Sequence, residues 1–280
     1  MTRPLYSFLP IEGNPDLNEA LREIDDSLRA LREEIQLVSA FGIQPFVAKQ
    51  GYAKFGFNPD IDTGTPEDIW SAGGTLVWPG SAATASVVSD NAADAAAGTG
   101  AQEVVLVGVD SSLDEVTEVV ATNGTTPVSS TASFLFVNAA YGRAVGSGGV
   151  NAGTIDVSIG GNLVKQIPPN TGQCLCSHFV CPNPRFAGEV PYLTAFDATL
   201  GKNASSWGQI EILTQIPGET LRVRSSIIAT GGAAVDYKIE SPIRLEPGER
   251  AWVRGADVSA NNEAIGAGIT ILYLNAPTNA

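Results

Sequence analysis

The sequence predicts a mainly β protein, in which an N-terminal α-helical coiled coil is followed by an antiparallel β-sandwich. Two observations support this fold class. Apolar residues recur at spacings of four and three through residues 17–38, which is the repeat of a left-handed coiled coil. From about residue 81 onward, short β-forming segments are separated by Gly, Pro and Asn turn signals, with no helical pattern between them.

The first element is an N-terminal anchoring arm, residues 1–16. It carries five apolar side chains, Leu5, Tyr6, Phe8, Leu9 and Ile11. A segment this short finds few partners within its own chain, so we expect it to dock into a larger particle, with a frayed terminus as the alternative. Prolines break the apolar stretch and no signal-peptide cleavage site follows it, so we expect synthesis and folding in a cytoplasm.

The second element is a coiled-coil stalk, residues 17–42. Its apolar stripe consists of Leu17, Leu21, Ile24, Leu28, Leu31, Ile35 and Val38. Two of the three a positions hold Leu and two of the four d positions hold a β-branched residue, which favours three or four helices over two. We therefore expect a homo-oligomer, with a homotrimer preferred. The alternative is an amphipathic helix packed on the chain's own β body.

The third element, residues 43–80, is predicted to be an irregular aromatic linker or collar. Its aromatic residues include Phe46, Tyr52, Phe55, Phe57, Trp70 and Trp78, and the prolines that interrupt them are Pro59, Pro66 and Pro79. Proline cannot donate to a sheet hydrogen-bond ladder, so this mixture favours a packed but irregular segment.

The fourth element is a β-sandwich knob, residues 81–280. The expected strands include 103–109, 115–121, 132–145, 172–180 and 207–215. Turn signals such as Asn123-Gly124 and Pro217-Gly218 fall between expected strands. Many short strands with frequent turns predict an antiparallel sandwich. The alanine-rich stretch 89–100 has no apolar period, so a loop is as well supported there as a helix.

The chain is strongly acidic, with 30 Asp and Glu against 16 Lys and Arg and a net charge of −14. Binding to phosphates needs clustered Lys and Arg, so we expect no nucleic-acid partner. No apolar run approaches the length of a membrane span, so we expect no membrane partner. A trimer would carry 3 × −14 = −42, which suits an outward-facing surface.

All three cysteines and the only histidine fall close together, as Cys174, Cys176, His178 and Cys181. These are ligand types that zinc prefers. In a strand, however, the first cysteine and the histidine would be about 13 Å apart, and Cys181 would point to the other face. We therefore expect buried, reduced thiols, with no metal and no other cofactor.

The sequence contains no G-x-S-x-G turn, no P-loop and no H-E-x-x-H motif. The lone His178 has no evident triad context. Carboxylate pairs such as Asp60 and Asp62 are expected by chance in a chain this acidic. We therefore expect a protein that is not an enzyme.

Four stretches resemble a family of virion structural proteins of tailed bacteriophages. They are residues 54–70 (KFGFNPDIDTGTPEDIW), 92–101 (AADAAAGTGA), 122–128 (TNGTTPV) and 134–153, which includes Asn138 and Asn151. The resemblance covers roughly residues 50–280 and preserves the order of the motifs. It implies a sandwich of jelly-roll type in a head-associated or tail-associated, fibre-like protein. The chain departs from the family at 180–184, where VCPNP replaces a Thr-Val-Pro-Ala-Gly turn, so the shape of that loop stays open.

These observations together predict a non-enzymatic, homotrimeric head fibre or decoration protein in the virion, assembled in the host cytoplasm. Its expected partners are copies of itself and other virion proteins, either of the capsid or of the tail. The alternative is a tail fibre or receptor-binding protein whose knob binds a host-surface glycan. Tyr192 and Trp207 are its candidate contacts, although both residues also suit core packing.

Overall fold

The computed structural model describes residues 50–201 and 205–275. The predicted arm and coiled-coil stalk lie outside these residues. Residues 50–273 form one compact unit, which is described below. Within the described ranges the regular elements are β-strands, and no helix there is long and apolar enough to cross a membrane.

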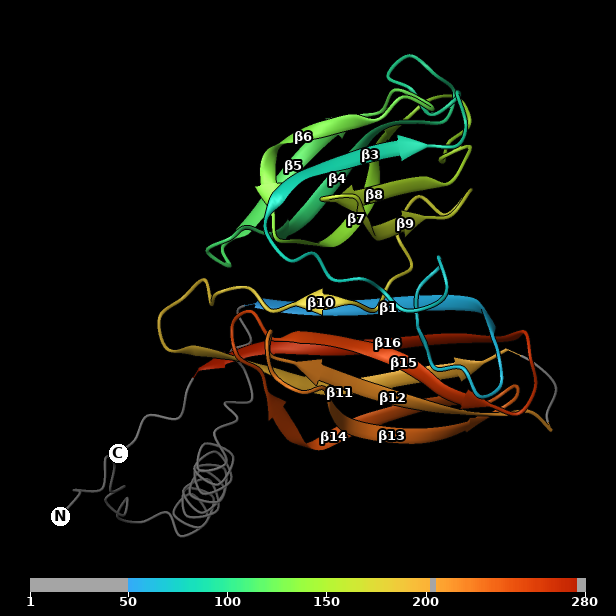
Figure 1. The fold of residues 1–280 in the computed structure, drawn as a ribbon, viewed down its shortest axis with the longest axis vertical. Coiled ribbons are helices and arrows are strands. Elements are labelled where there is room, and N and C mark those ends of the chain that lie inside the picture. Colours follow the sequence, from blue (N-terminus) through green and yellow to red (C-terminus); the bar gives the residue numbers. More distant parts are fainter. Residues whose placement is uncertain (1–49, 202–204, 276–280) are drawn as a thin grey trace, which may run out of the picture. The chain divides into compact units, whose positions relative to one another are not determined.

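Strands from both ends of the described chain form the first β-sandwich (Figure 1). They are β1 (Gln50–Ile61), β10 (Phe179–Val180), β11 (Glu189–Leu200), β12 (Trp207–Gln215), β13 (Arg222–Thr230), β14 (Ala234–Arg244), β15 (Arg250–Val258) and β16 (Glu263–Asn275). One sheet has the order β1-β16-β11-β14, and the other has the order β10-β15-β12-β13. The short strand β2 (Glu67–Asp68) also pairs with β15. The registers described for these sheets are antiparallel.

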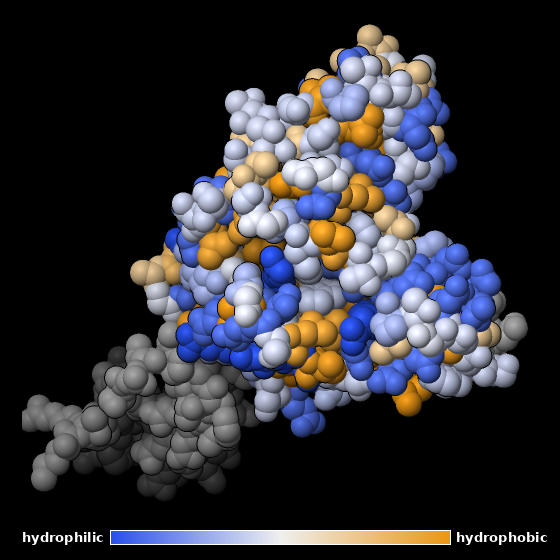
Figure 2. All heavy atoms as spheres, viewed as in Figure 1, coloured by the Kyte–Doolittle hydropathy of each residue, from blue (hydrophilic) through white to orange (hydrophobic). Residues whose placement is uncertain are grey.

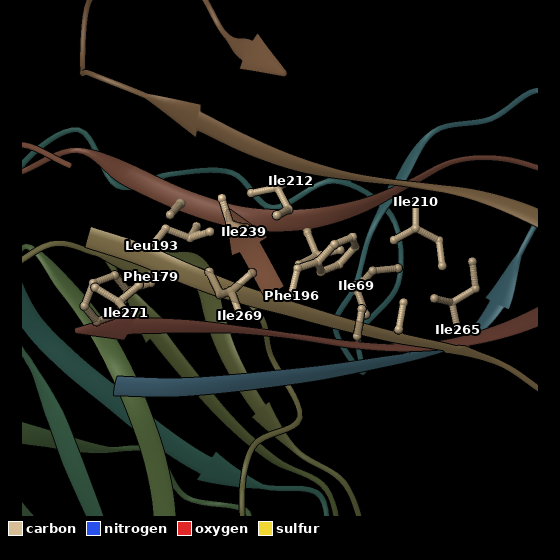
Figure 3. Close-up of a cluster of buried hydrophobic side chains, with 14 of the residues drawn as sticks. Ile69, Phe179, Leu193, Phe196, Ile210, Ile212, Ile239, Ile265, Ile269 and Ile271 are labelled. Carbon is tan, nitrogen blue, oxygen red and sulfur yellow. The ribbon is translucent and has the colours of Figure 1, made fainter. Parts of the chain in front are cut away.

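The core of the first sandwich lies between its two sheets and is mainly aliphatic (Figure 3). In β16, Ile265, Ala267, Ile269 and Ile271 are buried at every second position. This is the period of a strand with one face on a core. Phe196 of β11 fills the same space, and full burial of each such large side chain contributes about 1.5–3 kcal/mol.

The second β-sandwich is formed by the chain between β2 and β10. Its strands are β3 (Ala83–Ser89), β4 (Ala101–Val109), β5 (Glu115–Ala121), β6 (Val128–Phe134), β7 (Phe136–Val145), β8 (Ile155–Ile159) and β9 (Asn162–Ile167). The sheet orders are β6-β3-β8-β9 and β5-β4-β7. This sandwich has its own core, in which Leu106, Phe134 and Val157 are fully buried.

Two short segments contribute side chains to both cores. Cys176 and Val180 pack in the second core, whereas Phe179 and Cys181 pack in the first. Within residues 62–80, Ile69 likewise belongs to the first core and the adjacent Trp70 to the second. These segments therefore join the two sandwiches by packing as well as by chain connection.

The structure corrects the predicted boundaries of the linker and the knob. Residues 50–61 were expected to be irregular but form β1, which pairs with β16 from Gln50↔Tyr273 onward. The remainder, 62–80, is irregular apart from β2. The single knob predicted over 81–280 is divided between two sandwiches with separate cores. Residue periodicity indicates where strands occur but not which distant strands pair. For this reason the sequence does not predict that the strands belong to two separate sandwiches.

After Ser89, the last residue of β3, the alanine-rich stretch continues to residue 100 as turns and bends, organised by the buried carboxylate of Asp94. Its oxygens accept hydrogen bonds from the amides of Ala101 (2.7 Å), Ala152 (2.8 Å) and Gly153 (2.8 Å) and from the hydroxyl of Ser89 (2.7 Å). Burial by itself raises the pKa of Asp94, but these hydrogen bonds outweigh it and hold that pKa below its ordinary value. One carboxylate thus ties together loops of three different segments.

Candidate functional site

Four buried, ionisable side chains lie together in the described part of the chain, and we call them the buried cluster: Asp68, Lys165, Cys176 and His178. β2 supplies Asp68, β9 supplies Lys165, and the segment before β10 supplies the other two. Each is at most 2% exposed. The expected strand over 172–180 is wrong, because within it only Phe179–Val180 is a strand. The residues before it pair only through isolated bridges, at Gln173 and Cys176.

The four side chains form a continuous hydrogen-bonded row. The Nε2 of His178 lies 2.9 Å from Oδ2 of Asp68, and its Nδ1 lies 3.2 Å from Sγ of Cys176. Lys165 Nζ donates to Cys176 Sγ at 2.9 Å and to the carbonyl of His178 at 3.2 Å. Two anionic and two cationic groups therefore alternate along the row, so their charges can cancel.

Further donors fix the carboxylate of Asp68. Trp252 Nε1 donates to Oδ1 at 2.9 Å, and the amide of Leu76 donates to Oδ2 at 2.8 Å. The carboxylate thus accepts three hydrogen bonds, from β15, from the irregular segment after β2 and from His178. Such outer contacts hold both the carboxylate and the imidazole in one orientation.

Three tryptophans surround the His178 ring. Its centroid lies 5.6 Å from Trp70, 5.4 Å from Trp78 and 6.3 Å from Trp252, the last ring being stacked on it. These rings pack around the imidazole and keep solvent from it, in agreement with its complete burial.

The pKa shifts follow from this geometry. Burial by itself raises the pKa of Cys176, but Lys165 and His178 outweigh it and lower that pKa to about 5. Burial by itself lowers the pKa of His178, but Cys176 and Asp68 outweigh it and raise that pKa above its ordinary value. The two shifts have opposite directions, and together they favour a thiolate on Cys176 beside an imidazolium on His178.

A second buried lysine lies close to the cluster. Lys54 of β1 donates to the carbonyl of Asn138 in β7, and the Asn138 side chain exchanges two hydrogen bonds with Val180. Burial, together with repulsion from Lys165, lowers the pKa of Lys54 to about 8. These contacts join β1 of the first sandwich to β7 of the second.

The order Asp68–His178–Cys176 is that of an orienting carboxylate, a base and a nucleophile in cysteine hydrolases. The expectation that His178 lacks a triad context is therefore wrong at the level of geometry. A nucleophile must also reach a substrate, and Cys176 is 1% exposed. Neither a cavity of about 140 Å³ beside Trp78 and Arg250 nor one of about 170 Å³ beside Arg143 is lined by Cys176. The geometry therefore activates the thiol, but neither of these two cavities gives a substrate access to it.

The zinc candidates separate in the structure. Cys176 contacts His178, but Cys174 accepts a hydrogen bond from the Ala140 amide at 3.3 Å, and Cys181 lies 3.2 Å from the Tyr273 hydroxyl. All three thiols are free. Among the described residues, no three His, Cys, Asp or Glu side chains are grouped as a metal site.

The two glycan candidates lie in the first sandwich. Trp207 begins β12 and is 39% exposed, so it is not a core residue. Tyr192 of β11 is half-buried and lies opposite Arg244 of β14. The structure does not bring these two aromatics into one described contact.

Sequence reasoning missed Asp68, Lys165 and Trp252 as partners of the histidine. Asp68 lies 110 residues from His178 along the chain, so no local spacing could connect them. Asp68 does fall in a stretch that carries the family resemblance, 54–70, and so does Lys54. This overlap with the family resemblance is the sequence signal that could have indicated Asp68 and Lys54.

The chain matches no model of a known protein family, and no curated protein matches its sequence. The fold and the cluster define it as an antiparallel β protein of two sandwiches, joined by a buried, charge-balanced set of side chains.

Proposed function

We propose that this protein is a non-enzymatic structural component of a tailed-bacteriophage virion, a homotrimer that decorates the particle as a head fibre or decoration protein. The N-terminal arm and coil attach it to the particle, and the two sandwiches form the outward body.

The strand order of the first sandwich is the observation that carries this proposal. If its eight strands are numbered along the chain from β1 and β10 to β16, the two sheets read 1-8-3-6 and 2-7-4-5. In this order the chain passes repeatedly between the sheets, as in a jelly roll, and jelly rolls are frequent in viral capsid proteins. The second sandwich is then an insertion between the first two strands of the roll.

The buried cluster supports a structural role. Its four side chains come from segments of both sandwiches, and its thiolate is sealed from solvent. Buried charges tolerate little displacement because separating them leaves an uncompensated charge. The cluster therefore favours one fixed arrangement of the segments that supply it, which suits a particle component more than a catalyst.

Sedimentation of the full chain tests the oligomer. A homotrimer has three chains of 29.1 kDa, so we expect a mass of about 87 kDa. A mass of 29.1 kDa at micromolar concentration contradicts the proposal. Antibody labelling of intact particles then tests the location, and label on the capsid is the expected result.

The alternative, a tail fibre or receptor-binding protein, is favoured by one observation, the exposure of Trp207. Exposed tryptophan faces are common sugar-binding surfaces because they pair an apolar ring with a polar N–H. The test is binding of the full chain to immobilised host glycans, compared with Trp207→Ala. The full chain is required because β1 completes a sheet of the first sandwich. Binding that Trp207→Ala abolishes would favour this alternative over decoration.

A further inference from the structure

Two members of the buried cluster bring an amine and a thiol into direct contact inside the protein. The Nζ of Lys165 lies 2.9 Å from the Sγ of Cys176. Lys165 is 0% exposed and Cys176 1%. Lysine is rarely buried without a charged partner, and here that partner is a sulfur. By contrast, the face seen in Figure 2 mixes apolar patches with polar residues, which is ordinary for a protein surface.

The surroundings of Cys176 favour the form of its sulfur that reacts with oxidants. Although burial opposes the change, Lys165 and His178 lower the pKa of Cys176 to about 5. The thiolate is the form that attacks a peroxide, and the product is a sulfenic acid, Cys–SOH. Hydrogen peroxide is little larger than water, so local opening of the fold admits it more readily than a bulky thiol reagent. Oxidation of Cys176 is therefore slow but chemically favoured.

A sulfenic acid at Cys176 has two side-chain nitrogens beside its sulfur, and they differ in their charged partners. The Nδ1 of His178 lies 3.2 Å away, but His178 keeps Asp68 as its anionic partner, which favours an imidazolium without a free lone pair. The described partners of Lys165 are the thiolate, the His178 carbonyl and the ring of Phe136. Oxidation removes the charge of the thiolate, so burial then favours the neutral, nucleophilic amine of Lys165.

We propose that Lys165 and Cys176 form an oxidative crosslinking site, in which hydrogen peroxide joins Sγ of Cys176 to Nζ of Lys165 as a sulfenamide. The thiolate attacks a peroxide oxygen, so the S–O bond forms and the O–O bond breaks. The hydroxide that leaves takes a proton from the Lys165 ammonium. The neutral amine then attacks sulfur, the S–N bond forms, the S–O bond breaks, and the second hydroxide takes an amine proton. The sulfur loses two electrons, and one peroxide becomes two waters.

The crosslink joins β9 to the segment before β10. That segment contributes Cys176 to the second core and Phe179 to the first. A covalent bond at Cys176 therefore restricts a segment against which both sandwiches pack. Thiols reduce a sulfenamide, so the link is reversible. This inference goes beyond the proposed virion function and does not depend on it, because it requires only the folded chain.

Peroxide treatment of the native full chain, followed by trypsin digestion and mass spectrometry, tests the inference. Trypsin cannot cleave after a lysine whose amine is modified, so we expect one peptide spanning residues 144–185. Its mass should be lower by two hydrogen atoms than that of the unmodified sequence, and dithiothreitol should restore cleavage after Lys165. Cys176→Ser should abolish this peptide. The matched control is Cys174→Ser, which removes the half-buried thiol and should leave the peptide unchanged.

Three results would overturn the inference. The first is a sulfenic or sulfinic acid at Cys176 while trypsin still cleaves after Lys165. The second is a disulfide between two of the cysteines, which gives the same loss of two hydrogen atoms but leaves Lys165 open to trypsin. The third is a native chain in which Cys176 stays unmodified under peroxide that oxidises it in the urea-unfolded chain. The virion proposal stands or falls separately, on the mass of the oligomer and its location.

Discussion

Replacement of Asp68 by Asn is expected to destabilise the protein by about 3–5 kcal/mol, the range for breaking a buried ion pair by removal of one partner. Asp68 accepts hydrogen bonds at 2.8–2.9 Å from His178, Trp252 and the Leu76 amide. Asparagine keeps the size of the side chain but offers one acceptor oxygen in place of two. At least one buried donor then loses its partner, at about 1–3 kcal/mol, and the His178 imidazolium loses its carboxylate. These losses overlap, so they are not summed.

Urea unfolding followed by tryptophan fluorescence measures the effect, at fixed protein concentration because an oligomer's stability depends on concentration. The expected loss is a large part of the 5–15 kcal/mol that typical domains have. Asp60→Asn is the matched control, because Asp60 is an exposed carboxylate on β1, and we expect it to change stability by less than about 0.5 kcal/mol. A loss below about 1 kcal/mol for Asp68→Asn would refute a charged, tightly coupled cluster.

Three further predictions concern other parts of the fold. Because the pKa of Asp94 is lower in the folded chain than the unfolded value of about 3.9, its stabilisation is present above that pH and is lost as the pH falls through the folded value. Asp94→Ala should therefore cost about 2–4 kcal/mol at pH 7 and much less near pH 2, in urea titrations at both pH values. In the native protein, a thiol reagent should modify the half-buried Cys174 well before the buried Cys176, because burial restricts access even to a reactive thiol. Peptide mass mapping measures the two rates of modification. Equal rates would contradict this prediction. Gly56→Ala should prevent folding, because the added Cβ would lie 2.0 Å from the Ile69 carbonyl oxygen. Gly80→Ala is the control, because a Cβ there meets no atom within 4 Å, and its melting temperature should equal that of the unmodified chain.

Strand positions were largely predictable from sequence. The expected strands 115–121 and 207–215 coincide with β5 and β12, because alternating burial and flanking turn residues are local signals. The expected strand 132–145 is two strands, β6 and β7, which divide at Leu135 and enter different sheets. The sequence does not indicate this division between β6 and β7, because Phe134-Leu135-Phe136 form a continuous apolar run. All three side chains are fully or partly buried.

The candidate site was predictable only in part. Cys176 and His178 stand two residues apart, and the sequence marked them as a possible site, although for zinc. Their interpretation depended on Asp68 and Lys165, which arrive from β2 and β9. A buried lysine within a strand looks, in sequence, like any solvent-facing lysine of an alternating pattern. Only its neighbours show that it is paired with a thiolate.

The sequence by itself determined that this is an acidic, mainly β chain with a heptad repeat near its start, because composition and short periodicities are properties of neighbouring residues. The tertiary structure alone decided that β1 pairs with β16, that the body is two sandwiches, and that four distant ionisable side chains share one buried site. The physical reason is that these features depend on contacts between residues up to about 220 positions apart, such as Gln50 and Tyr273. Such contacts are selected by the packing of the whole core, and no local pattern records them.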